Sequence, residues 1–357
     1  MIEHYGWRPA LAQAFAPHAA RGLVPGRIIV QQRGLYIAAT DLGELRARPS
    51  GRLAHEAEEA GLPVVGDWVA LAARPDEGAA TIQALLPRRT AFLRRAAGGM
   101  ESVQAVAANV DVALLVASLN ADLNVRRLER YLAAAWQSGA RPVIVLTKSD
   151  LSPDPAAAIA EVERVAVGTQ VLALSALTGQ GMDALTAQAR PGETCVLLGS
   201  SGAGKSTLVN ALAGEPLMTT GAIREDDARG RHTTTHRELI LLISGALILD
   251  TPGMRELGLI DAEQGLDAAF GDIGALAGQC RFGDCSHGSE PGCAVRAALE
   301  DGRLDPGRWR SFDKLRRELA HQERQEDRLA RKAEQKRWIA VRKAQRAGRK
   351  LRDRERR

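Results

Sequence analysis

The sequence predicts a multidomain α/β protein: a small β-barrel, a doubly wound sheet that carries a phosphate-binding loop, and a C-terminal helical domain that binds a metal. Three observations predict this architecture. Residues 26–95 consist of short strands between Gly, Pro and Asp turns, residues 98–260 alternate apolar strands with helical segments, and cysteines gather within residues 280–293. A length of 357 residues also exceeds one ordinary compact domain.

The N-terminal barrel is predicted from four short strands with no helix between them. These strands are Arg27–Gln31, Gly34–Ala38, Val64–Leu71 and Ala80–Leu85. Several strands within about 70 residues are typical of an oligonucleotide-binding-type (OB-type) barrel, which would bind RNA. A structural β-domain without a ligand is the alternative. We assign the barrel to residues 26–97, after an extension of residues 1–25.

Alternating strands and helices follow a small-residue linker at residues 96–102. The predicted strands are Asp111–Ala117, Arg141–Leu146, Gln170–Leu174, Cys195–Leu198, Glu238–Ile243 and Ala246–Leu249. The predicted helices are Val125–Ser138, Ala156–Val167, Met182–Ala189 and Thr207–Leu212. This alternation predicts a doubly wound parallel sheet with ligands at the carboxyl ends of its strands.

A complete Walker A motif lies between the fourth of these strands and its helix. It comprises Gly199, Ser200, Ser201, Gly202, Ala203, Gly204, Lys205 and Ser206, with Thr207 following. In such a loop, successive backbone N–H groups point at phosphate oxygens, and the helix N-terminus favours anions. We expect Lys205 to reach the β- and γ-phosphates and the Ser206 hydroxyl to bind Mg²⁺.

Two other strand ends predict that the nucleotide base is guanine. Thr147, Lys148, Ser149 and Asp150 resemble the Asn-Lys-x-Asp motif of GTPases, and Ser175 and Ala176 resemble their Ser-Ala loop. The Asp150 carboxylate can accept from guanine N1–H and from the N2 amine, a donor pair that adenine lacks. Lys148 would pack its stem over the base. Thr147 replaces the usual Asn, so a hydroxyl must stand in for an amide.

Two further motifs predict contacts with Mg²⁺ and the γ-phosphate. Asp250 and Gly253 resemble the Asp-x-x-Gly switch, in which the carboxylate holds Mg²⁺ through water and the glycine amide senses the γ-phosphate. Thr234 is the expected magnesium-binding threonine, with Thr233 or Thr235 as alternatives.

The order of these motifs is unusual. Conventional GTPases place the phosphate loop first and the guanine motifs last, whereas here Thr147–Asp150 and Ser175–Ala176 precede Gly199–Ser206. The sequence therefore predicts a circularly permuted P-loop GTPase domain (G domain) over residues 98–260. Permutation preserves the sheet and its site when the original termini lie close together.

The C-terminal helical domain, assigned to residues 261–319, contains a predicted metal site. Cys280, Cys285, His287 and Cys293 offer three thiolates and one imidazole, which complete a tetrahedral shell and predict one structural Zn²⁺. Free surface thiols are the alternative. Cys195 is separate from this cluster and is predicted to be buried. Helices are expected over Ala294–Glu300 and Pro306–Leu319.

The positive charge of the chain belongs to its tail, residues 320–357. From His321 onward there are 15 Lys/Arg against 6 Asp/Glu, a net of +9, whereas the whole chain carries +5. Such a tail favours a polyanionic partner, nucleic acid rather than membrane, with a solvated helix or a disordered segment as the alternative. Few cysteines, no membrane-length apolar run and no signal-peptide pattern over Met1–Leu23 predict a cytoplasmic protein without membrane contact.

In this order, the barrel, permuted domain and Cys/His cluster resemble the ribosome small-subunit-dependent GTPase A family. Beyond the motif order and the Cys/His spacing, Gly230–Thr235, Val65–Val69 and Arg126–Leu132 also match. The resemblance implies a monomeric GTPase that binds GTP, GDP and Mg²⁺ and is stimulated by the small ribosomal subunit. It also implies an rRNA-contacting barrel, one structural zinc, and release of itself or other assembly factors late in subunit assembly. Residues 1–25 and the tail are outside it.

The water-orienting residue is predicted to be His232. Many GTPases use a Gln directly after the Asp-x-x-Gly glycine, but here that residue is Met254, so the free protein should hydrolyse GTP slowly. His232 precedes the expected magnesium threonine, and the resemblance indicates the same histidine; an exposed loop histidine is the alternative. Two other functions remain open: an RNA-binding module whose hydrolysis is incidental, and an ATPase or nucleoside kinase.

Overall fold

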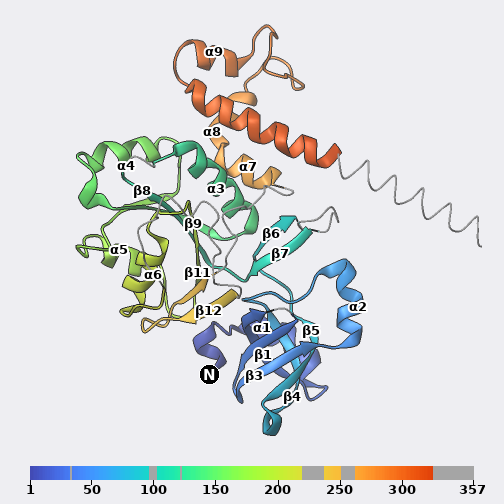
Figure 1. Ribbon diagram of the computed structural model, residues 1–357. Coiled ribbons are helices and arrows are strands. Elements are labelled where there is room, and N and C mark those ends of the chain that lie inside the picture. The colour runs from blue at the N-terminus through green and yellow to red at the C-terminus, as the bar shows by residue number, and fades with distance from the viewer. Residues whose placement is uncertain (33, 96–102, 121–122, 219–236, 251–261, 325–357) are drawn as a thin grey trace, which may run out of the picture.

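The computed structural model describes residues 1–324 except for residues 33, 96–102, 121–122, 219–236 and 251–261 (Figure 1). Figure 1 shows three bodies: the barrel, the sheet domain with its helices, and a helical body at the C-terminal end. Within the described ranges, no helix is both long and apolar enough to cross a membrane.

The N-terminal body is a closed five-stranded barrel. Its strands are β1 (Val24–Gln32), β2 (Leu35–Thr40), β3 (Gly43–Pro49), β4 (Trp68–Arg74) and β5 (Ala79–Leu85). They pair in the order β1-β2-β3-β5-β4, and β4 pairs again with β1, which closes the barrel. The predicted OB-type barrel is therefore confirmed.

The expected absence of a helix in the barrel is wrong. Helix α2 (Gly51–Ala60) connects β3, itself not predicted, to the segment before β4. The segment is rich in Ala and Glu, which are strong helix formers. The Ser50 hydroxyl also accepts a hydrogen bond from the Leu53 amide at 3.2 Å, which satisfies one free donor of the first turn.

The central sheet contains β8 (Val112–Ser118), β9 (Arg141–Thr147), β10 (Gln170–Ala173), β11 (Thr194–Leu198), β12 (Arg237–Leu241) and β13 (Leu247–Asp250). The order is β10-β9-β8-β11-β13-β12, and the first five strands are parallel. One correction concerns β12, which runs antiparallel to β13 because only residues 242–246 connect them, too few for a parallel crossover. β12 also pairs with β1, so the sheet continues into the barrel.

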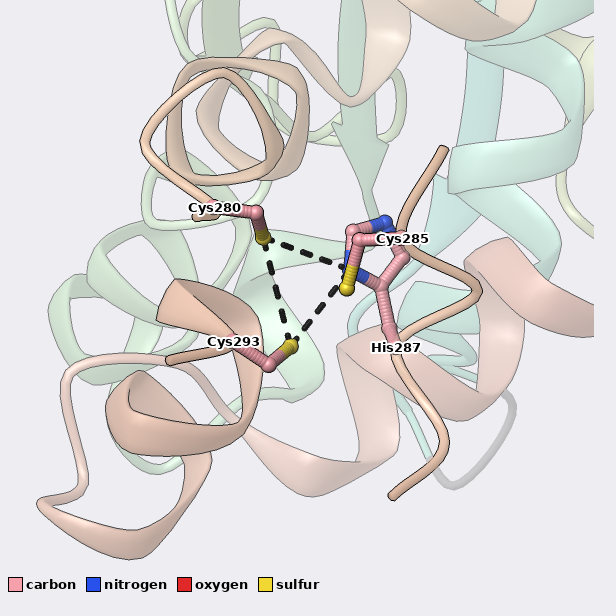
Figure 2. A group of neighbouring side chains, drawn as sticks. All are labelled: Cys280, Cys285, His287 and Cys293. Carbon is pink, nitrogen blue, oxygen red and sulfur yellow. Dashed lines mark hydrogen bonds between the residues drawn. The ribbon is translucent and has the colours of Figure 1, made fainter. Parts of the chain in front are cut away.

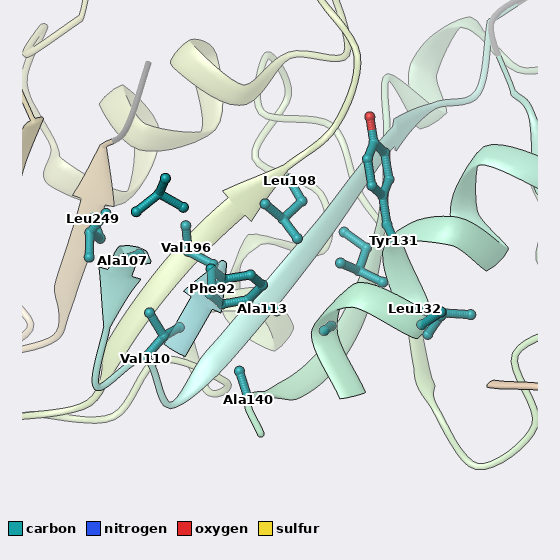
Figure 3. Close-up of a cluster of buried hydrophobic side chains, with 14 of the residues drawn as sticks. Phe92, Ala107, Val110, Ala113, Tyr131, Leu132, Ala140, Val196, Leu198 and Leu249 are labelled. Carbon is teal, nitrogen blue, oxygen red and sulfur yellow. The ribbon is translucent and has the colours of Figure 1, made fainter. Parts of the chain in front are cut away.

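Helices cover both faces of this sheet, which confirms the doubly wound architecture. The flanking helices are α3 (Val125–Ser138), α4 (Pro155–Glu163), α5 (Met182–Thr186) and α6 (Lys205–Ala213). Along β8, Ala113 and Leu115 share a buried cluster with α3 and α4, whereas Val112 and Leu114 share the other cluster with α5 and α6. Figure 3 shows the first cluster, with Tyr131 and Leu132 of α3.

A two-stranded sheet that the sequence analysis did not predict packs on the α3 side. Strands β6 (Ala91–Arg95) and β7 (Val103–Ala108) pair antiparallel, and Phe92 lies in the same buried cluster as Ala113 (Figure 3). The predicted linker between them, residues 96–102, lies outside the described residues.

The first 23 residues pack against the barrel and the G domain. A 3₁₀ helix, η1 (Ile2–Tyr5), and α1 (Pro9–Ala19) bury Ile2 and Phe15 in a cluster with Trp68 of β4. The buried Arg27 side chain of β1 donates to the Tyr5 carbonyl, to the Asn109 carbonyl at 3.2 Å and to Thr194 Oγ1 at 2.7 Å. Burial lowers the pKa of Arg27 to about 10. Arg27 thus joins the N-terminal segment and barrel to the start of β11.

The C-terminal body comprises α7 (Glu263–Ala269), α8 (Gly271–Ala277), α9 (Ala294–Glu300) and a helix over residues 306–324. α7 packs on α3, where the Gln137 side chain accepts from the Gly265 amide at 3.0 Å. Figure 1 shows the long C-terminal helix lying over α3 and α7.

A buried ion cluster fastens this body to the G domain. Arg308 of the C-terminal helix pairs with Glu129 of α3 at 3.0 Å and with Asp272 of α8 at 2.6 Å. It also donates to the carbonyls of Val165 and Ala269. Burial alone would lower the pKa of Arg308, but the two carboxylates outweigh burial and raise it. Arg308 is therefore a fixed cation between the two bodies.

Candidate nucleotide and metal sites

The predicted phosphate loop joins β11 to α6, at the carboxyl edge of the parallel strands. Gly199 lies so close to β8 that a Cβ there would be 2.3 Å from the Val116 carbonyl oxygen, which explains the glycine. The Lys205 ammonium donates to the carbonyls of Gly199 at 2.8 Å and Ser200 at 2.5 Å. The loop therefore presents a helix N-terminus and a lysine side by side, the pair of features that binds nucleotide phosphates.

The predicted guanine motif touches this loop directly. The buried Thr147 hydroxyl, at the end of β9, donates to the Ala203 carbonyl at 2.7 Å. The Lys148 ammonium donates to the Gly202 carbonyl at 2.9 Å. The Thr147 hydroxyl thus links the predicted base-binding loop to the phosphate loop. The usual Asn would make such a link with its side-chain amide, as expected above.

The two predicted base loops are also held together. The Ser149 amide donates to the Leu174 carbonyl at 3.1 Å, and Ser175, which follows Leu174, is buried. Ser149 Oγ is buried and has no hydrogen-bond partner among the described residues. The Asp150 side chain is exposed at the same edge. A buried unpartnered hydroxyl and an exposed carboxylate beside the phosphate loop fit a polar ligand such as a nucleotide base.

The remaining predicted nucleotide residues are only partly described. Asp250 ends β13, whose register with β11 pairs Leu249 with Val196, so its backbone lies at the phosphate-loop edge of the sheet. His232, Thr234 and Gly253 lie outside the described residues.

The four predicted zinc ligands converge in the C-terminal body (Figure 2). Their ligand atoms all lie within 4.8 Å of one another. His287 Nδ1 is 3.6 Å from Cys280 Sγ and 3.5 Å from Cys293 Sγ, and these two sulfurs are 4.0 Å apart. A tetrahedral Zn²⁺ with bonds of about 2.3 Å to sulfur and about 2.0 Å to nitrogen requires separations of roughly 3.5–3.8 Å. The donor set and its spacing therefore fit one zinc ion.

The surroundings hold the metal ligands in place. Trp309 of the C-terminal helix packs edge-on against His287, with 5.6 Å between the ring centroids. Helix α9 begins directly after Cys293. Burial and the nearby Arg316 lower the pKa of His287, which favours the neutral imidazole that binds metals. Cys195 lies apart from the cluster, and burial raises its pKa to about 12, as expected for an inert core thiol.

The residues that join the domains were not predicted from the sequence. Arg27 and Arg308 are isolated arginines in ordinary strand and helix segments, and their partners lie on other domains. One signal was present: Glu129 lies within Arg126–Leu132, a stretch that matched the family resemblance.

Comparisons with known proteins agree with this geometry. The family model described as RsgA GTPase matches residues 85–260. The chain is 48% identical over 356 residues to "Small ribosomal subunit biogenesis GTPase RsgA" of Opitutus terrae, covering 97% of each chain. The chain belongs to the RsgA GTPase family.

A second relative and two solved structures support the same family and fold. A protein of the same name from Streptomyces coelicolor is 48% identical over 322 residues, which cover 89% of this chain and 86% of that one. The crystal structure of YjeQ from Thermotoga maritima aligns with a TM-score of 0.64 at 26% identity, covering 84% of this chain and 99% of that one. YloQ, described as a circularly permuted GTPase, aligns with a TM-score of 0.60, which supports the predicted permutation.

Proposed function

We propose that this chain hydrolyses GTP in biogenesis of the small ribosomal subunit, is stimulated by that subunit, and couples hydrolysis to its own release or that of assembly factors. The contact between Thr147 and the Ala203 carbonyl carries the proposal, because it brings the guanine motif and the phosphate loop together despite their reversed order. The family's printed names support the ribosomal partner.

In this proposal, backbone amides of Gly199–Thr207 and the Lys205 ammonium bind the phosphates. Thr147–Asp150 and Ser175–Ala176 bind guanine, and Gly253 senses the γ-phosphate. Ser206, Asp250 and Thr234 would hold Mg²⁺, which offsets the charge that develops on the phosphate oxygens. Thr233 and Thr235 remain alternatives to Thr234.

Stimulation by the subunit would act through His232. Because Met254 cannot hydrogen-bond a water usefully, another side chain must orient the attacking water. A neutral His232 imidazole would do this by accepting a hydrogen bond from the water when the subunit places the imidazole beside it. We further propose that the barrel contacts rRNA, that the C-terminal cluster holds one structural zinc, and that the protein works as a monomer in the cytoplasm.

GTP turnover by the full chain with purified small subunits, large subunits or neither tests the proposal. We expect small subunits, and not large subunits, to raise turnover at least about tenfold. The increase should be the same at 150 mM and at 300 mM KCl, because stimulation by any polyanion would weaken as the salt concentration rises. His232→Ala should lower the stimulated rate about 100-fold and leave GDP affinity unchanged.

His4→Ala is the control, because His4 is an exposed histidine of η1, outside the barrel and the nucleotide residues. Equal turnover with and without small subunits would refute stimulation by the subunit and favour a nucleotide-regulated RNA-binding module. Undiminished stimulation of His232→Ala would refute the role of His232. Tighter binding of ATP than GTP would favour an ATPase or a nucleoside kinase.

A further inference from the structure

A groove of about 440 Å³ lies between α3 and the C-terminal helix, away from the nucleotide and zinc residues. We call it the basic groove and define it by Arg126, Arg127 and Arg130 of α3 with Arg310 and Lys314 of the C-terminal helix. The other residues that line it are uncharged, so its lining carries five cations and no anion.

Only part of this charge is neutralised by neighbouring carboxylates. Arg126 pairs with Asp305 and, at 2.7 Å, with Glu129, and Arg130 pairs with Glu318 at 2.9 Å. Arg310 and Lys314 are exposed and have no carboxylate within ion-pair distance among the described residues. The groove therefore retains a positive field that faces solvent.

Gly307 leaves room for Arg126 at one end of the groove. Gly307 stands where the C-terminal helix begins, and a Cβ there would lie 2.5 Å from the Arg126 guanidinium. Glycine thus lets Arg126 lie across the start of the helix instead of being pushed away from it.

Basic residues continue along the same helix, with carboxylates among them. A second hollow of about 370 Å³ is lined by Arg310, Lys314, Arg317 and His321 together with Asp313 and Glu318. Asp313 pairs with Arg317 at 2.7 Å and Glu318 pairs with Arg130, so Arg310 and Lys314, one helical turn apart, carry the charge that has no carboxylate partner among the described residues. Beyond this helix the sequence continues into the basic segment 325–357.

We propose that the basic groove binds the ribose–phosphate backbone of RNA. The proposal rests on the ribosomal function proposed above and names a contact surface other than the barrel. The five cations of the groove come from two helices, which exceeds what one phosphate ion needs and matches several phosphates of one RNA strand.

An acidic protein fits the groove less well than RNA does. Protein interfaces depend on apolar and aromatic anchors at their centre. The apolar residue that lines the groove, Leu315, is buried, and Phe312 and Trp309 pack against the domain core instead. The groove instead offers guanidinium and ammonium groups, which are positively charged hydrogen-bond donors. Such groups bind phosphate oxygens without contacting the bases.

Full-length Arg310→Ala/Lys314→Ala tests the proposal. Binding to purified small subunits and to a fluorescein-labelled 20-base-pair RNA duplex is measured between 50 and 300 mM KCl. We expect affinity for both to fall about tenfold, and the slope of log affinity against log salt to fall by about 1.8 for the duplex, because two phosphate contacts are lost. GTP turnover without subunits should not change.

Arg164→Ala/Arg190→Ala is the matched control. Both arginines are exposed and lie outside the basic groove, and replacing them removes two positive charges, as in the test variant. Equal binding and equal salt slopes for the two double variants would overturn RNA binding by the groove. That result would not affect the proposal that small subunits stimulate GTP hydrolysis. If wild-type protein neither binds nor responds to small subunits, the proposed function fails, and the RNA duplex still tests the groove. Full competition by millimolar inorganic phosphate, or equally tight groove-dependent binding of polyglutamate, would also overturn it.

Discussion

Replacing Arg308 with alanine is expected to destabilise the docking of the C-terminal body on the G domain by about 3–5 kcal/mol. Arg308 is 4% exposed, and its guanidinium is the partner of Glu129 and Asp272. Without it, the fully buried Glu129 carboxylate would keep only its contact with Arg126. A buried carboxylate that loses one of its two arginine partners is costly because the protein interior solvates it poorly.

Hydrogen exchange of α9 and of residues 306–324, together with urea unfolding, measures the effect. Arg303→Ala is the matched control, because the Arg303–Asp301 pair lies at the surface of the same body and should contribute less than about 1 kcal/mol. If Arg308→Ala and Arg303→Ala exchange and unfold alike, the buried cluster does not fasten the two bodies.

Replacing Cys293 with serine should abolish zinc binding. A serine hydroxyl does not supply the thiolate that Zn²⁺ needs, and three remaining ligands leave the tetrahedral shell open. In zinc-finger peptides a structural zinc contributes about 10–16 kcal/mol, so the turns between Cys280 and Cys293 should lose their protection from hydrogen exchange.

Elemental analysis of the purified protein should give about one zinc per chain for wild type and near zero for Cys293→Ser. Cys195→Ala should keep its zinc, because Cys195 is buried on β11, apart from the cluster. Equal metal content in wild type and Cys293→Ser would refute the predicted site.

The elements that local pattern determines were predictable. The bounds of α3 were predicted correctly because Asn124 caps the helix, Gly139 ends it and one face is apolar. Helix α9 was also predicted with its observed bounds. Conversely, β3 and the β6–β7 pair were missed although each pairs with the neighbouring strand of the chain. In β3 only Leu45 and Ala47 are buried, between exposed charged residues, and β6 and β7 are five and six residues long, so neither region has a long apolar run.

The site divides in the same way. Motif chemistry predicted the phosphate loop, the base loops and the metal cluster, because ligands require particular residues at fixed spacing. Neither the bond from Thr147 to the phosphate loop nor the role of Arg308 could be predicted, since each depends on which chain segments the fold brings together. Both neighbouring bodies contact the G domain through its regular elements. Arg27 of the barrel bonds to the start of β11, the strand before the phosphate loop, and α7 of the C-terminal body packs on α3.

The central claim is that a loop early in the chain reads guanine while the following phosphate loop holds the phosphates. Affinities of full-length wild type and Asp150→Asn for GDP, XDP and ADP test it most directly. Asp154→Asn is the control, because Asp154 caps α4, where Asn serves equally well. We predict that Asp150→Asn lowers GDP affinity about 100-fold, because one of the two acceptor oxygens becomes an amide donor that faces the guanine N2 amine. The same amide can donate to the xanthine 2-oxo group, so XDP affinity should rise. Unchanged GDP affinity in Asp150→Asn, or equal binding of ADP and GDP by wild type, would contradict the claim.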